Sequence, residues 1–250
     1  MILTLINFLN KRLLRCLVFG VLFTSISMAQ EIKLSNEGVS GNNSTDVLQR
    51  LEKDVINKSP DLVILMVGTN DMVNSNHMLS FNEYTENLQK IVGNLKVNKT
   101  KVVLMSPPPV DSIYLFQRHD PKKFKECPNV KLSRLSELIE KLALENNIFF
   151  LDLFSEFNER QIPNHNQDLY IRNEKNSGVG DGVHMTPMGN ELIAGIIYEF
   201  LKKNQLLKPN SKIACLGDSL TYGARMVGEA TTIGQTYPAY LNRKINDKNE

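Results

Sequence analysis

Cysteine and histidine are scarce in this sequence, which contains three of the first and four of the second among 250 residues. Neither type occurs in the close groups that hold a structural zinc ion, so the sequence predicts no metal centre and no cofactor. Cys16 lies in the N-terminal segment described next, which leaves Cys127 and Cys215. Cys215 stands within an apolar stretch, where a packed thiol is favoured over half of a disulfide bond.

Tryptophan is absent, and neither sign of charge is in clear excess, with 29 basic and 27 acidic residues. Residues 1–29 hold three basic residues and no acidic one, and an apolar run over 16–26 precedes Ser27-Met28-Ala29. This order is typical of a secretory signal peptide cleaved after Ala29, and the run is too short to span a bilayer comfortably. We therefore expect a secreted or periplasmic protein that keeps no stable membrane anchor. Removing the three basic residues changes the formal net charge from +2 to −1, which gives no reason to expect a nucleic-acid partner.

Internal repeats and low-complexity tracts are also missing, and residues 30–250 are expected to form one domain. Short apolar runs alternate with helical patterns throughout, which predicts a parallel α/β sheet with helices on both faces. The expected strands cover residues 32–34, 62–67, 102–105, 148–153 and 213–216. The expected helices begin at Ser44 or Thr45, after a capping box at Ser80 and Glu83, before Leu132, at Pro187 behind an N-cap at Thr186, and near Thr236. A mixed loop up to about residue 129, a long polar loop over 155–182 and a linker over 202–210 connect them.

The last of these strands delivers a serine to a loop. The apolar run 213–216 stops at Gly217, and Asp218 and Ser219 follow. In open parallel sheets ligands bind at the carboxyl ends of the strands, so Ser219 is a candidate nucleophile. It needs a base and donors for the oxyanion that forms on attack.

Other strand ends supply those groups. The segments 38–43 and 68–71 each begin where an apolar strand stops, and Asp181 and His184 precede the helix at Pro187. All of these positions share one edge of a parallel sheet, so they can converge on Ser219. His184 can accept the serine proton, and Asp181 can curl back to hold the imidazole. The backbone amides of Ser219 and Gly41 and the side-chain amide of Asn70 can supply an oxyanion hole.

The blocks Gly217-Asp218-Ser219-Leu220, Ser40-Gly41, Gly68-Thr69-Asn70-Asp71 and Asp181-Gly182-Val183-His184 resemble those of the SGNH, or GDSL, hydrolase family. The resemblance covers residues 31–250. It implies a flavodoxin-like three-layer α/β/α sandwich with a five-stranded parallel sheet. It also implies a Ser219, His184 and Asp181 triad, with Ser219, Gly41 and Asn70 as the oxyanion hole.

The order of the blocks departs from the family, in which the serine block normally comes first. Here it comes last, so the chain resembles a circularly permuted member of the family. If the serine strand keeps its usual interior place, the five strands lie in the order 1-5-2-3-4. Lys248 would then lie near Glu31, within roughly 10–15 Å. A rival interpretation is a tandem or swapped assembly in which Ser219 completes a neighbour's site.

The expected function is that of a serine esterase acting on a small-molecule or glycan ester. The loops 107–128 and 155–180 are polar, with Tyr114, Phe116, Arg118, Tyr170 and Arg172 interspersed. This favours a short acyl group on a polar alcohol, such as an O-acetylated sugar. The resemblance points to bacterial carbohydrate acetylesterases, including sialate O-acetylesterase-like members.

Alternatives remain open from the sequence. One is a lysophospholipase or acyl-thioesterase, and another, of a different class, is a non-catalytic glycan-binding module on the same scaffold. The oligomeric state is unknown. The remaining polar residues receive structural interpretations: Asp71, Asp152 and Asp218 are expected to stabilise loops, and His77, His119 and His165 to lie in surface loops.

Overall fold

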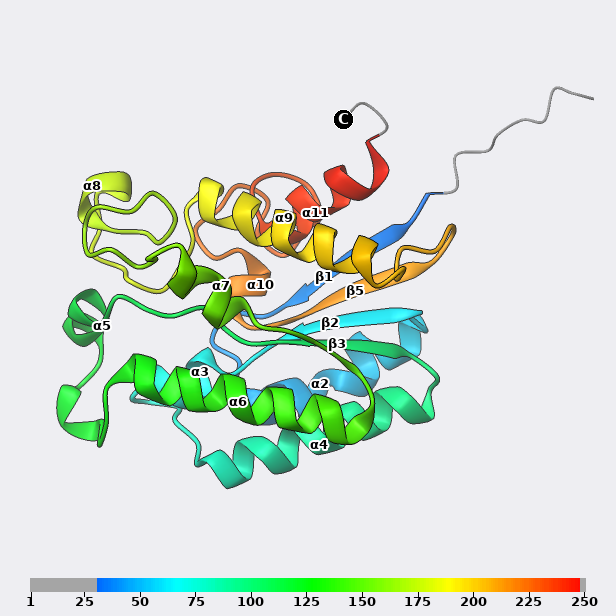
Figure 1. Cartoon of the computed structure of the whole chain (residues 1–250), viewed down its shortest axis with the longest axis horizontal. Helices are drawn as coiled ribbons and strands as arrows, with labels where there is room; N and C mark the ends of the chain where they lie inside the picture. Colours follow the sequence, from blue (N-terminus) through cyan, green and yellow to red (C-terminus); the bar gives the residue numbers. More distant parts are fainter. Residues whose placement is uncertain (1–30, 248–250) are drawn as a thin grey trace, which may run out of the picture. The chain divides into compact units, whose positions relative to one another are not determined.

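The computed structural model describes residues 31–247, and Figure 1 gives the labels of its helices and strands. The signal peptide predicted for residues 1–29 and the predicted position of Lys248 lie outside the described residues. No helix within 31–247 combines the length and hydropathy needed to cross a membrane.

The five strands form one parallel sheet in the order β1-β5-β2-β3-β4, which confirms the predicted order. Their bounds are Lys33–Gly38 (β1), Leu62–Met66 (β2), Lys101–Met105 (β3), Phe149–Leu151 (β4) and Lys212–Gly217 (β5). All five residues of β2 are buried, as expected for a strand covered on both faces. The last strand, β5, is therefore interior, and Gly217 pairs with both Gly38 and Met66 at the carboxyl edge.

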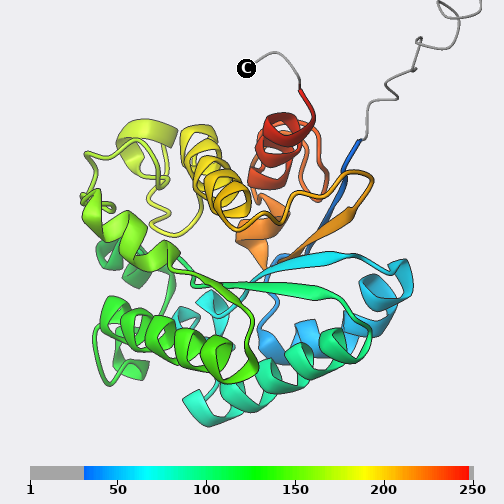
Figure 2. The same ribbon diagram turned by 45° about the vertical axis from the view of Figure 1, so that its right-hand side comes forward.

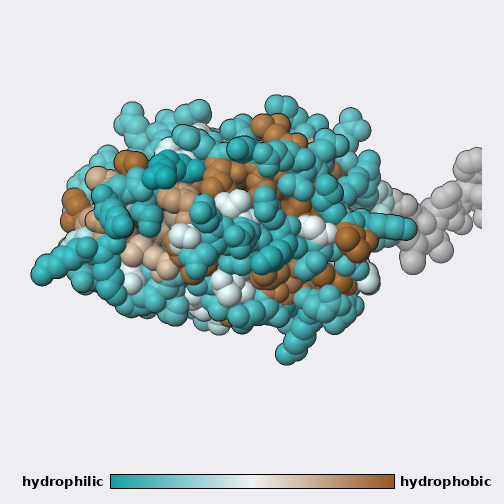
Figure 3. Space-filling model, turned by 90° about the horizontal axis from the view of Figure 1, so that it is seen from below, coloured by the Kyte–Doolittle hydropathy of each residue, from teal (hydrophilic) through white to brown (hydrophobic). Residues whose placement is uncertain are grey.

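Two layers of helices cover the sheet, as Figures 1 and 2 show. On one side lie α2 (Ser44–Asp54), α3 (Thr69–Val73), α4 (Phe81–Val97) and α6 (Pro128–Asn146). On the other lie α9 (Pro187–Lys203) and α11 (Tyr237–Asn246). Side chains of β2 alternate between the two cores: Val63 and Leu65 pack with the first layer, and Ile64 with the second. Seen from the side of α4 and α6, the exposed surface is mostly hydrophilic, with apolar side chains showing between the polar ones (Figure 3).

Local capping sets where the helices begin. The predicted capping box of α4 is present, because Ser80 accepts from the Glu83 backbone while the Glu83 carboxylate accepts from the Ser80 backbone. Thr186 caps α9, as predicted. The cap of α2 is Asn43 rather than Ser44 or Thr45. The Asn43 side chain accepts from two backbone N–H groups, and the Asp46 carboxylate accepts from the Asn43 backbone N–H.

Several boundaries differ from the sequence prediction. Strand β1 continues through residues 36–38, which were expected in a loop, because pairing with β5 extends to Gly38. Strand β4 ends at Leu151 rather than at residue 153, because Asp152 caps α7 (Leu153–Glu159). The two connections expected to be loops contain α5 (Ser112–Arg118), a 3₁₀ turn (Pro121–Lys123) and α8 (Glu174–Ser177), and the first and last of these are capped by Asp111 and Asn173. The linker begins after Lys203, where α9 ends.

The first and last described elements are joined by hydrogen bonds. The Ile32 backbone N–H donates to Asn246 Oδ1 at 3.1 Å, and Asn246 Nδ2 donates to the Ile32 carbonyl at 2.9 Å. The start of β1 and the end of α11 are therefore neighbours on the surface.

Candidate active site

Ser219 begins the single-turn helix α10 (Ser219–Tyr222) directly after β5. The turn is held by Asp218, whose side chain accepts from the Leu220 backbone at 2.9 Å. Gly217 is needed here, because a Cβ at this position would lie 2.3 Å from both the Met66 carbonyl oxygen and the Thr221 hydroxyl oxygen. The strand therefore passes close to β2 and turns sharply, which presents the Ser219 hydroxyl at the sheet edge.

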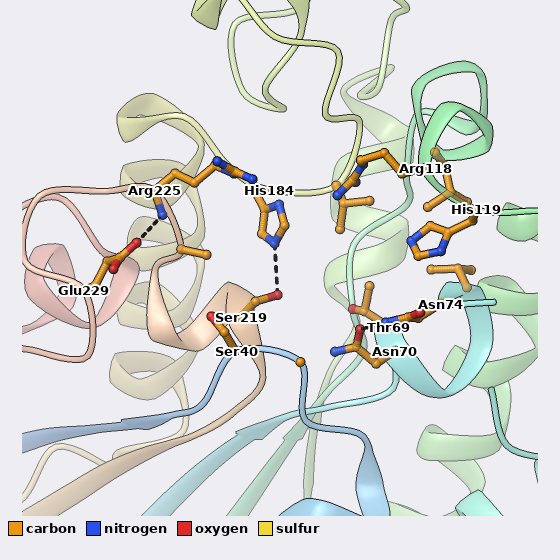
Figure 4. Close-up of a pocket in the computed structure, with 15 residues that line it drawn as sticks. Ser40, Thr69, Asn70, Asn74, Arg118, His119, His184, Ser219, Arg225 and Glu229 are labelled. Carbon is orange, nitrogen blue, oxygen red and sulfur yellow. Dashed lines mark hydrogen bonds between the residues drawn. The ribbon is translucent and has the colours of Figure 1, made fainter. Parts of the chain in front are cut away.

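His184 meets this hydroxyl from the segment before α9. The distance between His184 Nε2 and Ser219 Oγ is 3.1 Å, and Figure 4 shows this bond. On the other side of the ring, Nδ1 lies 2.9 and 3.0 Å from the two carboxylate oxygens of Asp181. A bond to a carboxylate places the ring hydrogen on Nδ1, so Nε2 is free to accept the serine proton.

Asp181 reaches His184 because the backbone turns back between them. Gly182 has a φ of +76°, and a Cβ there would approach the Asp111 carbonyl oxygen to 2.6 Å, so glycine fits both the conformation and the space. The turn also lets the Asp181 carboxylate accept from the backbone N–H groups of Val183 and His184. The segment thus fixes the ring and its carboxylate together.

The carboxylate of Asp181 is 4% exposed and is surrounded by cationic groups. Arg118 Nη2 donates to the Asp181 carbonyl at 2.7 Å and to its carboxylate at 3.3 Å, and Arg225 Nε lies 3.7 Å from the second oxygen. Burial alone would raise the pKa of Asp181, but the bonds from His184, its charge and the charge of Arg118 outweigh burial and hold this pKa well below its ordinary value. Asp181 is therefore ionised at neutral pH.

Asn70 in α3 is held in one orientation. Its Oδ1 accepts from Asn74 at 3.0 Å, and its Nδ2 donates to the Asn42 carbonyl at 2.9 Å, which leaves one amide hydrogen for another acceptor. Gly41, which has a φ of +85°, lines the same cavity as Asn70. Across residues 31–247, the backbone N–H groups of Gly41 and Ser219 donate to no protein atom.

A cavity of about 460 Å³ brings these groups together. Its polar lining comes from the sequence-predicted residues Gly41, Asn70, His184 and Ser219 and from Ser40, Thr69, Asn74, Arg118, His119, Arg225 and Glu229. Four apolar residues, Val73, Leu115, Val183 and Ala224, also line it. Asp181 stands behind His184 and does not line the cavity.

Two buried carboxyl groups, those of Asp218 and Asp71, lie outside the cavity lining. Burial raises the pKa of Asp218 to about 7 and that of Asp71 to about 6, and their mutual repulsion adds to the rise for Asp218. Each has one oxygen bonded to a backbone N–H, of Leu220 and Ser44 respectively, and one without a hydrogen-bond partner. Neither lines the cavity, in keeping with the structural role expected for them.

Asp152 is also structural, because it accepts from the hydroxyl groups of Ser106, Ser136 and Ser155. Of the other histidines, His77 is exposed and His165 pairs with Asp111 at 2.7 Å. His119 lies outside the helix, in the turn that follows α5, as predicted for a loop residue, but it is half-buried and lines the cavity, which the sequence did not predict.

Metal ligands do not gather in the described part of the chain: no three histidine, cysteine or acidic side chains are arranged to hold an ion.

The chain is similar to known proteins. A sequence model of the GDSL-like Lipase/Acylhydrolase family matches residues 24–192. An acetylxylan esterase from Geobacillus stearothermophilus is 28% identical over 136 residues, which are 51% of this chain and 57% of that esterase. The chain thus spans little more than half the length of this relative.

Two solved structures are also similar to this chain in fold and sequence. A catalytic mutant of an acetylxylan esterase from Geobacillus stearothermophilus, in which a serine is replaced by alanine, has a TM-score of 0.50 and 25% identity, covering 66% of this chain and 69% of that one. A GDSL-like lipase from Bacteroides thetaiotaomicron has a TM-score of 0.50 and 28% identity, covering 67% and 75%.

Proposed function

Because the chain belongs to the GDSL-like Lipase/Acylhydrolase family, we propose that it is a serine esterase that removes short acyl groups, in particular O-acetyl groups, from carbohydrate. Relatives described as an acetylxylan esterase and a GDSL-like lipase support a hydrolase of carboxylic ester bonds. The observation that carries the mechanism is the continuous chain of hydrogen bonds from Ser219 through His184 to Asp181 at one cavity.

In the proposed mechanism, His184 Nε2 takes the Ser219 proton while Oγ attacks the ester carbonyl carbon. The carbonyl oxygen becomes an oxyanion and accepts from the N–H groups of Ser219 and Gly41 and from Asn70 Nδ2. The intermediate collapses as His184 returns the proton to the alcohol oxygen, which leaves. Water then attacks the acyl-enzyme with the same base, and the acid and free serine are released.

The two kinds of cavity lining support a small acyl group on a polar alcohol. The apolar side chains that line the cavity, among them Val73, Leu115 and Val183, are few, which suits a methyl group rather than a long chain. The charged groups of Arg118, Arg225 and Glu229 stand where a hydroxylated alcohol would be received. The relatives described as acetylxylan esterases agree with this substrate class.

Acetate release tests this proposal. We expect the wild-type protein to release acetate from acetylated xylan, pectin or sialic acids, and Ser219→Ala to release none while remaining folded. Glycan binding without acetate release, unchanged by Ser219→Ala, would favour a binding module. Preference for lysophospholipids or acyl-thioesters would move the substrate to the alternative enzyme class.

The location of the protein belongs to the same proposal. Cleavage after Ala29 would give a secreted or periplasmic enzyme, which N-terminal sequencing of the exported protein tests.

We also propose that the order of the blocks is a circular permutation of the family order. The interior place of the last strand, the bonds between Ile32 and Asn246, and a family match that stops before Ser219 support it. A rearranged gene that places residues 208–247 before 31–207 is expected to encode an equally active protein, and loss of activity in a folded product would contradict the permutation.

A further inference from the structure

A second histidine lies across the cavity from His184. His119 directly follows Arg118, the last residue of α5, and it lines the same cavity as Ser219 and Asn70. Figure 4 shows its ring beside Arg118 and on the opposite side of the cavity from His184. The mechanism described above leaves it without a role.

The contacts of its ring determine which nitrogen carries the hydrogen. Nδ1 of His119 lies 3.3 Å from the backbone nitrogen of Ser75 and 3.3 Å from the Ser75 hydroxyl oxygen. A backbone N–H can only donate, so Nδ1 must be an acceptor and carry no hydrogen. The Asp120 backbone N–H donates to the same hydroxyl at 3.4 Å, which leaves the hydroxyl hydrogen free to point at Nδ1. The hydrogen of the neutral ring is therefore on Nε2.

The surroundings also keep this ring neutral. Burial and the positive charge of Arg118 lower the pKa of His119. The two histidines consequently have opposite tautomers: His184 offers a bare Nε2 to Ser219, whereas His119 offers an Nε2–H group. Within the described range of the chain no protein atom accepts from that group.

We propose that His119 is a substrate-binding residue whose Nε2–H donates a hydrogen bond to an oxygen of the alcohol part of the ester, such as a sugar hydroxyl or ring oxygen. This inference rests on the proposed esterase function. An acetyl group brings only its carbonyl oxygen as a strong acceptor, and the donors of Ser219, Gly41 and Asn70 already serve that oxygen. The acceptor for His119 must therefore lie on the alcohol, beside the polar groups of Asn74 and Arg118.

Two variants and two esters test the proposal. His119→Phe keeps a planar ring and removes the donor, whereas His119→Gln keeps an N–H donor. With an acetylated xylo-oligosaccharide, His119→Phe is expected to lower kcat/KM roughly fivefold, mainly through KM, as for the loss of one neutral hydrogen bond. With phenyl acetate, whose alcohol has no further oxygen, kcat/KM is expected to stay within about twofold. His119→Gln is expected to recover much of the loss, and the control His77→Phe, at an exposed position outside the cavity, is expected to change neither ester.

Equal losses on both esters, or no loss on the sugar ester, would overturn the proposal. Nitrogen NMR of the imidazoles gives a test that does not depend on turnover: we expect the Nε2–H tautomer for His119 in the wild-type protein, and an Nδ1–H tautomer would refute the assignment. Failure of the esterase function looks different, because the wild-type protein would then release no acetate, or Ser219→Ala would release it equally well.

Discussion

Replacing Asp218 by asparagine is expected to make the folded protein gain stability relative to wild type as the pH rises. Asp218 is fully buried, and its pKa is raised from 3.8 to about 7. Because the folded state keeps the proton longer than the unfolded state, the group's contribution to stability is complete below about pH 3.8 and is lost as the pH rises through about 7. Asparagine retains an oxygen that can accept from the Leu220 backbone but cannot ionise.

The magnitude follows from the pKa difference. The difference between a pKa of 3.8 in the unfolded chain and about 7 in the folded protein corresponds to about 4 kcal/mol of unfolding free energy in total. About 2 to 3 kcal/mol of this is lost between pH 5 and pH 8. Since the chain has no tryptophan, urea unfolding followed by far-ultraviolet circular dichroism measures it for both proteins at the two pH values. A difference between wild type and Asp218→Asn that is the same at pH 5 and pH 8 would refute the reasoning.

The remaining predictions concern catalysis and can be read by steady-state kinetics with short-chain aryl esters. His184→Ala is expected to lower kcat by about 10⁴-fold or more in a folded protein, because in the described part of the chain the Ser219 hydroxyl bonds to no base other than His184. Asn70→Ala is expected to lower kcat roughly 10²- to 10³-fold with little change in KM, and an unchanged kcat would remove Asn70 from the oxyanion site. Rates are expected to fall steeply from acetyl to butyryl to octanoyl esters, and a preference for octanoyl would point to a lipid or thioester substrate. A chelator is expected to leave activity intact, and its complete loss with recovery on adding zinc would contradict the metal-free mechanism.

The sequence predicted the sheet well because its strands have patterns that depend on few residues. The run at Leu62–Met66 is apolar throughout, and the capping box at Ser80 and the Thr186-Pro187 pair mark helix starts locally. The strand order came from the family resemblance, since no local pattern states which strands are neighbours. Capping also decided the boundaries that were missed, where Asn43 and Asp152 compete with neighbouring polar residues for the same backbone groups.

The cavity wall formed by α5 could not be predicted in the same way. This helix has only seven residues and no long apolar repeat, so its pattern is weak. The bond of Arg118 to Asp181 joins residues 63 positions apart, and the contact of His119 with Ser75 joins residues 44 apart. Partners at such separations are set by how the elements pack, and residue type alone gives no signal for them.

The interior place of β5 makes the order of synthesis matter. Strands β1 and β2 are synthesised long before β5, yet each pairs with β5 and not with the other. The growing chain therefore lacks the strand that lies between them until residues 212–217 have been made. The same residues lead directly into Ser219, so the insertion of β5 between its neighbours also places Ser219 in the candidate active site. A fragment of residues 31–207 and a separate peptide of residues 208–247 are thus two natural halves of the chain, and the proposed ester hydrolysis would report that the halves have associated.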